Sequence, residues 1–340
     1  MSLLSKEALL EHIEKAIEES GGGFRAIKET HPFVLYVFDR ENSERFRIYI
    51  WNITHGGGYK RAANEYRIQI TMAERESAIE VTRPFKTLLL GYDPRFKVFA
   101  GYNAARYQTA RFSASVQIKE EFLAQAAQEG FAVQPKETDA QGNVTEVAVA
   151  FSPEQFLTYA FNLEAYHQDS IPARELQVIQ RAASTPLTDD DLTILPEPRR
   201  RAIKEFNYAV RDKRFAKNVL QAYGHKCAIC KVQLKLVEAA HIVPVKENGT
   251  DEVVNGVALC ANHHKAFDGG LILLKVDNQL MLIEKKTKEL RSKNLHGGIQ
   301  DFQNALSLGT PISLPSDPRY HPKPEYILQR LRLEGFRNTL

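Results

Sequence analysis

The chain has few cysteines and no long apolar segment. Only three of its 340 residues are cysteine, namely Cys227, Cys230 and Cys260, and all lie in one short region. An odd, clustered set argues against a disulfide framework and for metal ligation. No apolar run approaches the roughly 18 residues that a membrane helix needs, and the start has no basic segment followed by an apolar block. We therefore expect a cytoplasmic protein that does not associate with membranes.

The chain also lacks a large excess of either charge. Its formal net charge is only +3, with 26% charged and 43% hydrophobic residues, which are globular values. At 340 residues it is too long for one ordinary core and of the right length for two domains. Basic residues are nevertheless concentrated between Arg199 and Lys217. Such a run is typical either of a solvated helix face or of a phosphate-binding strip.

The first half of the chain is predicted to be rich in strands, with helices beside them. Leu9, Ile13 and Ile17 recur at helical spacing, and residues 32–38 and 45–53 have the pattern of strands. Further apolar or alternating runs follow, up to "VTEVAVAF". The pattern indicates an α+β fold whose N-terminal domain is strand-rich with flanking helices.

One of these strands, residues 45–53, has two different faces. Its basic and aromatic face carries Arg45, Arg47, Tyr49 and Trp51. The glycine-rich loop that follows adds His55, Lys60 and Arg61. Aromatic and cationic side chains on one face suit stacking on bases and contact with phosphate. The alternative is that the aromatic residues pack under a helix and the arginines are solvated.

The domain boundary is expected where prolines and acidic residues replace periodic sequence. The segment "ASTPLTDDDLTILPEPRRR" combines three prolines with an acidic cluster. We predict a recognition or sensor domain over residues 1–185, a linker over 186–198 and a second domain over 199–300. Residues 301–340 are expected to form a C-terminal extension that packs on the second domain.

The cysteines form a specific metal-binding pattern. Cys227-x-x-Cys230 lets two thiolates reach one tetrahedral ion, and Cys260-x-x-His263 offers the same geometry from a second segment. Four protein ligands leave no open position, so the predicted Zn²⁺ is structural. The alternative is three buried cysteines without a metal.

A second metal site is predicted from the residue after His263. Neighbouring helical residues point about 100° apart, so His264 cannot face the same ion as His263. Asp268 lies four residues on and shares the face of His264, so an imidazole and a carboxylate can hold a second, open metal. Upstream, a strand-like segment carries His241, and Asn255 precedes a glycine. Taken singly, these two are more often a satisfied polar residue and a turn.

The order His241, Asn255, His264, framed by the two metal-binding pairs, resembles the HNH endonuclease family. The resemblance covers roughly residues 199–285, and "FAKNVLQAYGHKCAIC", "VEAAHIVP" and "FDGGLI" are similar to predicted bacterial restriction endonucleases. It implies a zinc-stapled ββα-metal domain that cuts nucleic acid. The fusion to another domain also resembles modification-dependent restriction enzymes.

The resemblance implies a role for each residue of the site. His241 would be the general base that takes a proton from water, and Asn255 would hold the loop and orient that imidazole. His264 with Asp268 would hold one Mg²⁺-like ion at the scissile phosphate. The implied substrate is double-stranded DNA, either unmodified or modified, and cutting both strands favours a homodimer.

One position departs from the family pattern. Many HNH proteins have Asp or His immediately before the first histidine, whereas this chain has Ala240. The nearest carboxylate is Glu238, which on a regular strand faces opposite His241. The third ligand of the catalytic metal therefore stays open.

Three functions are compatible with the sequence. The first is a metal-dependent DNA endonuclease of restriction or defence, in which the N-terminal domain selects target or modified DNA. The second is a defence nuclease that a small signal activates through a ligand-sensing N-terminal domain. The third is a non-catalytic DNA-binding module that contains zinc.

Overall fold

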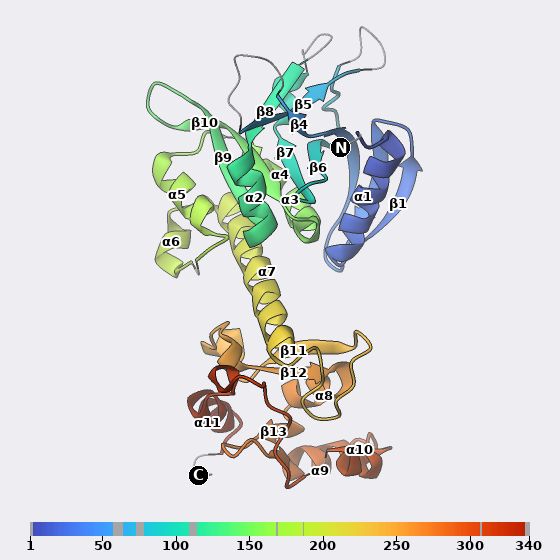
Figure 1. Ribbon diagram of the computed structural model, residues 1–340, viewed down its shortest axis with the longest axis vertical. Coiled ribbons are helices and arrows are strands. Elements are labelled where there is room, and N and C mark those ends of the chain that lie inside the picture. Colours follow the sequence, from blue (N-terminus) through green and yellow to red (C-terminus); the bar gives the residue numbers. More distant parts are fainter. Residues whose placement is uncertain are drawn as a thin grey trace. The chain divides into compact units, whose positions relative to one another are not determined.

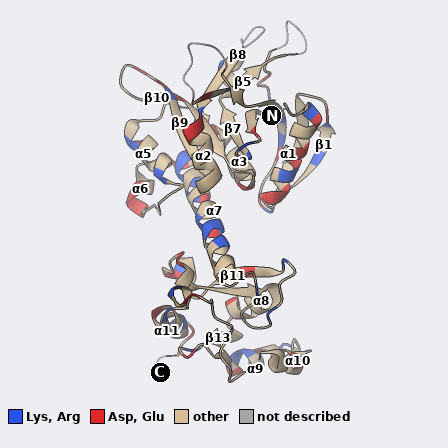
Figure 2. Ribbon diagram, viewed as in Figure 1, with Lys and Arg blue, Asp and Glu red and all other residues tan. Residues whose placement is uncertain are grey.

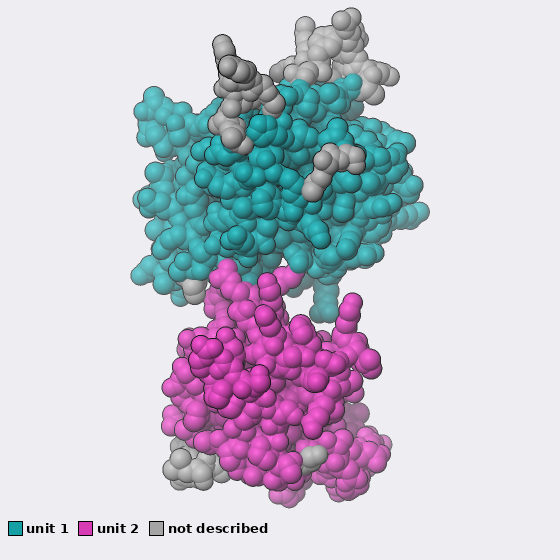
Figure 3. Space-filling model, viewed as in Figure 1, with its two compact units in different colours: residues 1–210 teal, residues 211–340 magenta. Residues whose placement is uncertain are grey.

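The computed structural model describes residues 3–56, 64–72, 78–108, 114–167, 169–185, 187–306 and 308–336. The chain forms two compact units, residues 1–210 and 211–340, shown in Figure 3. The predicted mixed α+β fold with a strand-rich N-terminal part is confirmed. Among the described residues, no helix combines the length and apolar character that crossing a membrane requires.

Unit 1 is built on a seven-stranded sheet in the order β1-β2-β3-β6-β7-β10-β9 (Figure 1). β3 and β6 run parallel, and the other neighbouring pairs are antiparallel. A second sheet pairs β4, β5 and β8. The strands are β1 (Gly23–Lys28), β2 (Phe33–Phe38), β3 (Ser43–Asn52), β4 (Thr54–His55), β5 (Glu65–Ile70), β6 (Lys86–Asp93), β7 (Val98–Tyr102), β8 (Ala114–Lys119), β9 (Phe131–Thr138) and β10 (Val144–Phe151).

In the sequence of unit 1, one helix precedes the strands, and the other helices lie between or after them. They are α1 (Lys6–Glu19), η1 (Ala104–Tyr107), α2 (Glu120–Glu129), η2 (Pro153–Gln155), α3 (Phe156–Phe161), α4 (Leu163–His167), α5 (Ala173–Arg181) and α6 (Asp189–Thr193). α1 begins where the Ser5 hydroxyl accepts a hydrogen bond from the Ala8 amide. Its apolar stripe is buried, as its helical spacing predicted.

The large sheet has a core on each of its faces. Phe46, Ile48 and Ile50 of β3 join the cluster that includes α1. Tyr49 and Trp51, which alternate with them, join a second cluster that includes residues of β5, β8 and α2. They are only 1% and 6% exposed, so the interpretation of these two rings as an exposed stacking face is wrong. A strand covered on both faces keeps its alternation of residue types without having a solvent side.

The segment expected to be a linker, residues 186–198, lies within unit 1. Asp191 completes a capping box with Thr188, which starts α6. Leu192 and Leu195 are buried in the same core cluster as α1. The acidic cluster therefore serves as a helix start rather than as a solvated tether.

The two units divide within one helix, α7 (Glu197–Ala222), between Val210 and Arg211. Phe206 and Val210 belong to the core of unit 1, and Phe215 and Val219 belong to the core of unit 2. The basic run found in the sequence occupies this helix (Figure 2).

Unit 2 is organised around the antiparallel hairpin of β11 (Val237–His241) and β12 (Gly256–Cys260). Gly256 has no Cβ, and a Cβ there would lie 2.4 Å from Val219 and 2.9 Å from Phe215, so α7 packs directly on β12. The remaining elements are η3 (Val245–Glu247), η4 (Val253–Asn255), α8 (Ala261–Asp268), β13 (Ile272–Leu274), β14 (Leu280–Leu282), α9 (Glu284–Ser292), α10 (Ile299–Ala305), η5 (Pro318–Tyr320) and α11 (Pro324–Leu333).

Residues of the C-terminal segment contribute to the core of unit 2. Ile327 and Leu331 of α11 are buried in the same cluster as β11 and β12. Arg330 is 5% exposed and donates hydrogen bonds to the carbonyl oxygens of Phe267 and Asp268, which end α8. These bonds stabilise the C-terminus of α8, where carbonyl groups lack helical partners.

Candidate active site and metal centre

The four predicted zinc ligands lie together in unit 2. Cys227 and Cys230 come from the turn after α7, Cys260 ends β12, and His263 lies in the first turn of α8. Their ligand atoms all lie within 4.8 Å of one another, and His263 Nδ1 is 3.2 Å from Cys260 Sγ and 3.4 Å from Cys227 Sγ. All three cysteines are free of disulfides. A set of three thiols and one imidazole at this spacing could hold Zn²⁺ in tetrahedral geometry.

The electrostatics of this cluster favour a thiolate. Burial raises the pKa of the Cys227 thiol, but hydrogen bonds from His263 and from backbone amides outweigh it and lower that pKa to about 6. Burial and the neighbouring Cys227 raise the pKa of Cys230 to about 11. Zinc binds cysteine as the thiolate, so Cys227 already has the charge state that a metal ligand needs.

His241 lies at the end of β11 in a fixed orientation. Its ring stacks on Phe215 of α7, with 3.6 Å between ring centroids and 9° between ring planes. Its Nε2 lies 3.1 Å from Asp251 Oδ1, and the side chain is 16% exposed. An ionised carboxylate only accepts hydrogen bonds, so in the neutral ring Nε2 carries the hydrogen and Nδ1 keeps its lone pair. The arrangement sets the tautomer that a base acting through Nδ1 requires.

Asp251 is itself held by a cation. Its Oδ2 accepts a hydrogen bond of 2.5 Å from Nε of Arg211, which lies on α7. Burial raises the pKa of the Asp251 carboxyl, but the hydrogen bond with His241 and the charge of Arg211 outweigh it and keep that pKa below its ordinary value. Arg211, Asp251 and His241 therefore form one connected chain of charge and hydrogen bonds.

Asn255 is buried with no exposed surface and holds the loop between the two strands. Its side-chain oxygen accepts from the Val243 amide, and its side-chain nitrogen donates to the carbonyl oxygens of Val243 and Thr250. Its backbone carbonyl accepts from the Ile242 amide. These bonds fix the backbone on either side of His241 and Asp251, and none of them reaches the imidazole of His241.

His264 lies between two carboxylates. Its Nδ1 is 2.6 Å from Glu238 Oε2 on β11, and its Nε2 is 3.3 Å from Asp268 Oδ2 one turn along α8. A neutral imidazole has one N–H and so satisfies only one carboxylate, and a proton or a metal ion would satisfy the other. The two carboxylates lie at opposite nitrogens of the ring, and a metal ion binds one ring nitrogen, so one ion cannot take all three side chains in this arrangement. Among the described residues these three do not form a metal group of their own, and the pair that could share a divalent cation of the Mg²⁺ or Mn²⁺ kind is Nε2 of His264 with Asp268.

The predicted residues fall into two groups on the hairpin. β11 pairs with β12 without a register shift, so Glu238 and His241 lie on opposite faces of the strand. Glu238 contacts His264 on α8, whereas His241 contacts Phe215 on α7. Among the described residues, no hydrogen bond or ion pair joins His241 to His264 directly.

The sequence alone did not single out Asp251, Arg211 or Phe215. Asp251 lies in the loop between His241 and Asn255, and nothing in its spacing shows which ring nitrogen it meets. Arg211 and Phe215 are four residues apart on α7, which does place them on one helical face. The basic run was the only available signal for this group.

Two family models match separate parts of the chain. Residues 227–275 match the family described as HNH endonuclease, and this range contains the zinc ligands, His241, Asn255 and His264. The chain carries an HNH endonuclease domain. The resemblance seen in the sequence is therefore confirmed for this domain. The predicted enzyme class, an HNH endonuclease, is confirmed with it. Residues 44–160 of unit 1 match the family described as Methylase-associated X1.

No curated protein matches this chain. One solved structure described as a "Modification dependent TagI restriction endonuclease" matches 86% of this chain and 81% of that chain, at 12% identity and a TM-score of 0.26. These values are too low to transfer an arrangement or a function.

The basic residues of unit 1 expected to read DNA have different surroundings. Arg45 is exposed, and Arg47 forms an ion pair of 3.0 Å with Glu80 while its guanidinium lies 4.7 Å from the centre of the Phe85 ring. His55 is exposed in β4. Lys60 and Arg61 lie outside the described residues.

Proposed function

We propose that the protein is a metal-dependent endonuclease of double-stranded DNA in which unit 1 selects the target and the HNH domain cuts it. The observation that carries the proposal is the HNH family match over a domain in which His241 is held by Asp251. We further propose a cytoplasmic role in restriction or defence. The match of unit 1 to a family named for its association with methylases supports this role.

His241 is the proposed general base. Its Nδ1 accepts a proton from a water molecule, whose oxygen attacks phosphorus as the bond to the leaving oxygen breaks. The hydrogen on Nε2 is donated to Asp251, which stabilises the positive imidazole that results. Arg211 keeps Asp251 ionised and in place. Phe215 prevents the ring from turning by stacking on one face.

One of the two proposed metal sites is structural and the other is catalytic. Cys227, Cys230, Cys260 and His263 would hold Zn²⁺ and so tie the turn after α7 to β12 and α8. His264, through Nε2, and Asp268 would hold the catalytic divalent ion. When bound, that ion would supply positive charge that stabilises the negative charge developing on the phosphate. Glu238 would accept the hydrogen on Nδ1 of His264 and so leave Nε2 available to the ion.

The direct test is plasmid cleavage by the purified chain. Incubation of unmodified and methylated plasmid with Mg²⁺ should give cutting, and EDTA should prevent it. Preference for one plasmid supports selection by unit 1. Cutting that begins only when a nucleotide is added would favour the signal-activated nuclease. DNA binding without cutting under any divalent metal would show that the domain is a non-catalytic DNA-binding module.

A further inference from the structure

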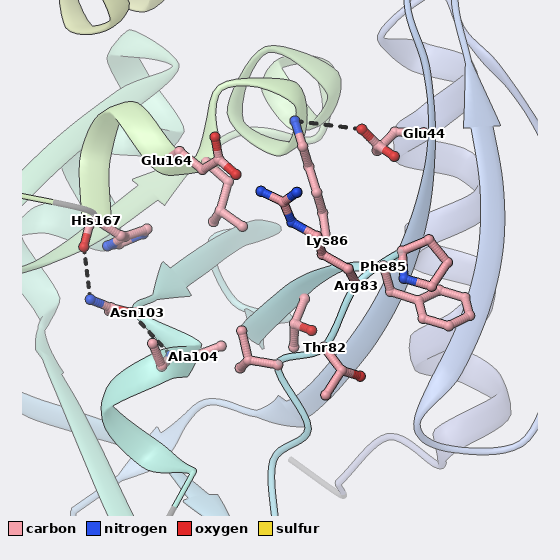
Figure 4. Close-up of a pocket in the computed structure, with 14 residues that line it drawn as sticks. Glu44, Thr82, Arg83, Phe85, Lys86, Asn103, Ala104, Glu164 and His167 are labelled. Carbon is pink, nitrogen blue, oxygen red and sulfur yellow. Dashed lines mark hydrogen bonds and ion pairs between the residues drawn. The ribbon is translucent and has the colours of Figure 1, made fainter.

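Unit 1 contains a cavity of about 660 Å³ that the chemistry of the HNH domain does not use. Four separate parts of the unit line it, namely the start of β3, the segment 81–87 that leads into β6, η1 and α4 (Figure 4). This volume lies within the range of roughly 300–1,000 Å³ that small-molecule sites occupy. Most of the lining belongs to the part of the chain matched by the methylase-associated family.

Two opposite charges on the cavity wall have no partner in the part of the chain that the structure describes. Lys86 forms an ion pair of 3.7 Å with Glu44 and donates to the Phe161 carbonyl oxygen at 3.3 Å, so its charge is compensated within the wall. Arg83 and Glu164 also line the cavity, yet among the described residues neither side chain has a hydrogen bond or an ion pair, even with the other. The cavity therefore offers a free guanidinium and a free carboxylate to whatever occupies it.

His167, which also lines the cavity, is held rigidly. Nε2 of His167 lies 2.9 Å from the Tyr159 hydroxyl, while its Nδ1 is buried without a hydrogen-bond partner. Burial lowers the pKa of His167 to about 3, so the ring is neutral at physiological pH. Asn103 donates to the His167 carbonyl oxygen at 2.8 Å and accepts from the Ala105 amide, which holds α4 and η1 in place. The neutral, immobile ring and these bonds make this side of the cavity rigid.

The unpaired charges define the chemistry of the occupant. A planar guanidinium binds phosphate through two parallel hydrogen bonds. A carboxylate accepts hydrogen bonds from the amino group of a base, as Asp and Glu do from cytosine. A simple anion would leave Glu164 unpaired, and a simple cation would leave Arg83 unpaired. Apolar residues in the wall, Val81, Ala104 and Leu163, offer contact to an aromatic ring.

We propose that this cavity binds one nucleotide unit, with the phosphate at Arg83 and the amino-bearing edge of the base at Glu164. The inference deepens the target selection proposed above and rests on it. This nucleotide can come from two sources with the same chemistry. It is either a nucleotide turned out of DNA or a free nucleotide. In the first case the cavity selects the base that directs cutting, and in the second it senses a signal that permits cutting.

The first test measures binding of free nucleotides by calorimetry. It uses the full chain carrying His241→Ala, with dCMP, dAMP, dGMP and dTMP as probes together with the matching nucleosides. Bases with an exocyclic amine should bind more tightly than thymine. Arg83→Gln should weaken the monophosphates about tenfold and leave the nucleosides unchanged. Glu164→Gln should remove the preference against thymine.

The second test asks whether the nucleotide comes from DNA. The same variants are titrated with duplexes that carry no modification, 5-methylcytosine or N6-methyladenine, each with 2-aminopurine beside the test base. Tighter binding with increased 2-aminopurine fluorescence, lost in Arg83→Gln and Glu164→Gln, assigns the DNA source. Binding of monophosphates without any duplex effect assigns the free source.

Control variants separate the cavity from general charge effects. Arg25→Gln and Glu41→Gln change exposed residues of unit 1 outside the cavity and should bind like the parent. If all four variants bind every probe like the parent, or if no probe binds, the cavity is not a nucleotide site. Cleavage of plasmid by the parent with Mg²⁺ is measured in parallel, so failure of this inference is distinguishable from failure of the nuclease function.

Discussion

At the scale of single residues, the orientation of His241 is decided by groups that are far apart in the sequence. Asp251 determines which nitrogen carries the hydrogen, and Phe215 determines the plane of the ring. Neither group touches the nitrogen that would meet water. Their contribution to catalysis is therefore one of positioning, and it can be measured separately from that of His241.

Substitution of Asp251 tests this positioning. Asp251→Asn keeps the shape but places an amide against Nε2, so the favoured tautomer and the stabilising charge are both lost. We expect kcat for DNA cleavage to fall by about 10- to 100-fold with little change in KM. The matched control is Asp212→Asn, an exposed carboxylate next to Arg211 on α7, which should cleave like the parent. Equal kcat for the two variants would contradict the role of Asp251.

Substitution of His241 tests the base itself. His241→Ala removes the group that takes the proton, and cleavage should fall by at least about 100-fold. DNA binding and the melting temperature should stay close to those of the parent, because the ring is at the edge of the core. Gel shift, differential scanning calorimetry and plasmid cleavage provide the three measurements. Cleavage at the parental rate would refute the assignment.

Much of the site was predictable at this scale because metal ligands obey short-range rules. Cys227 and Cys230, and Cys260 and His263, are each three residues apart, and that spacing alone brings their side chains together. Asp251 meets His241 only through the path of an irregular loop, which no residue spacing describes. The partner of a side chain in such a loop depends on tertiary structure.

At the scale of elements, the zinc cluster joins the turn after α7 to the junction of β12 and α8. The turn at Cys227, the end of β12 at Cys260 and the start of α8 at His263 meet at one point. Cys227→Ser removes one thiolate, so the site should lose zinc and the HNH domain should melt at a lower temperature. Metal analysis and calorimetry measure the two effects. Ser313→Ala is the control, because the Ser313 amide donates to the Ala228 carbonyl oxygen of the same turn and this bond does not need the hydroxyl. Equal zinc content in Cys227→Ser and the parent would exclude a structural zinc.

The contact between α7 and β12 depends on one glycine. Gly256→Ala would place a methyl group 2.4 Å from Val219 Cγ2 and 2.9 Å from Phe215 Cε2, so α7 must move away from the strand. We expect the free energy of unfolding to fall by about 1–3 kcal/mol, as for other overpacked cores. Unfolding by denaturant, monitored by far-ultraviolet circular dichroism, measures the change.

The matched control for this substitution is Gly297→Ala in the same unit, where a Cβ would have no neighbour within 4 Å. Its stability should stay within about 0.5 kcal/mol of the parent. Because Phe215 stacks on His241, Gly256→Ala should also lower kcat. Unchanged stability in Gly256→Ala would mean that α7 does not pack on β12 as described.

Sequence patterns predicted the positions of helices and strands better than they predicted what covers each face. The helical spacing of Leu9, Ile13 and Ile17 predicted α1, because one apolar stripe faces one core. Alternation in β3 predicted a strand but gave the wrong environment for Tyr49 and Trp51, since periodicity reveals two faces and not what covers them. The prolines before α7 suggested a linker, although proline is also common in the first turn of a helix.

At the scale of the whole molecule, the chain contains one HNH domain and a duplex has two strands to cut. The proposed homodimer supplies a second active site. With increasing protein concentration, plasmid should first be nicked and then linearised, and linearisation should rise more steeply than nicking. Gel analysis of the products and mass photometry of the protein measure both. A monomer that linearises plasmid in one binding event would contradict the homodimer.

The hydrogen bonds of Asn255 also affect the deamidation of its side chain. Asparagine followed by glycine deamidates readily in flexible chains, because the glycine nitrogen reaches the asparagine carbonyl without steric hindrance. In the folded HNH domain this amide is buried and donates to two carbonyl oxygens, which protects it. An aspartate formed during unfolding would face those two oxygens without a hydrogen to donate. Each unfolding event thus risks a permanent chemical lesion, and heat inactivation should become irreversible with time spent unfolded.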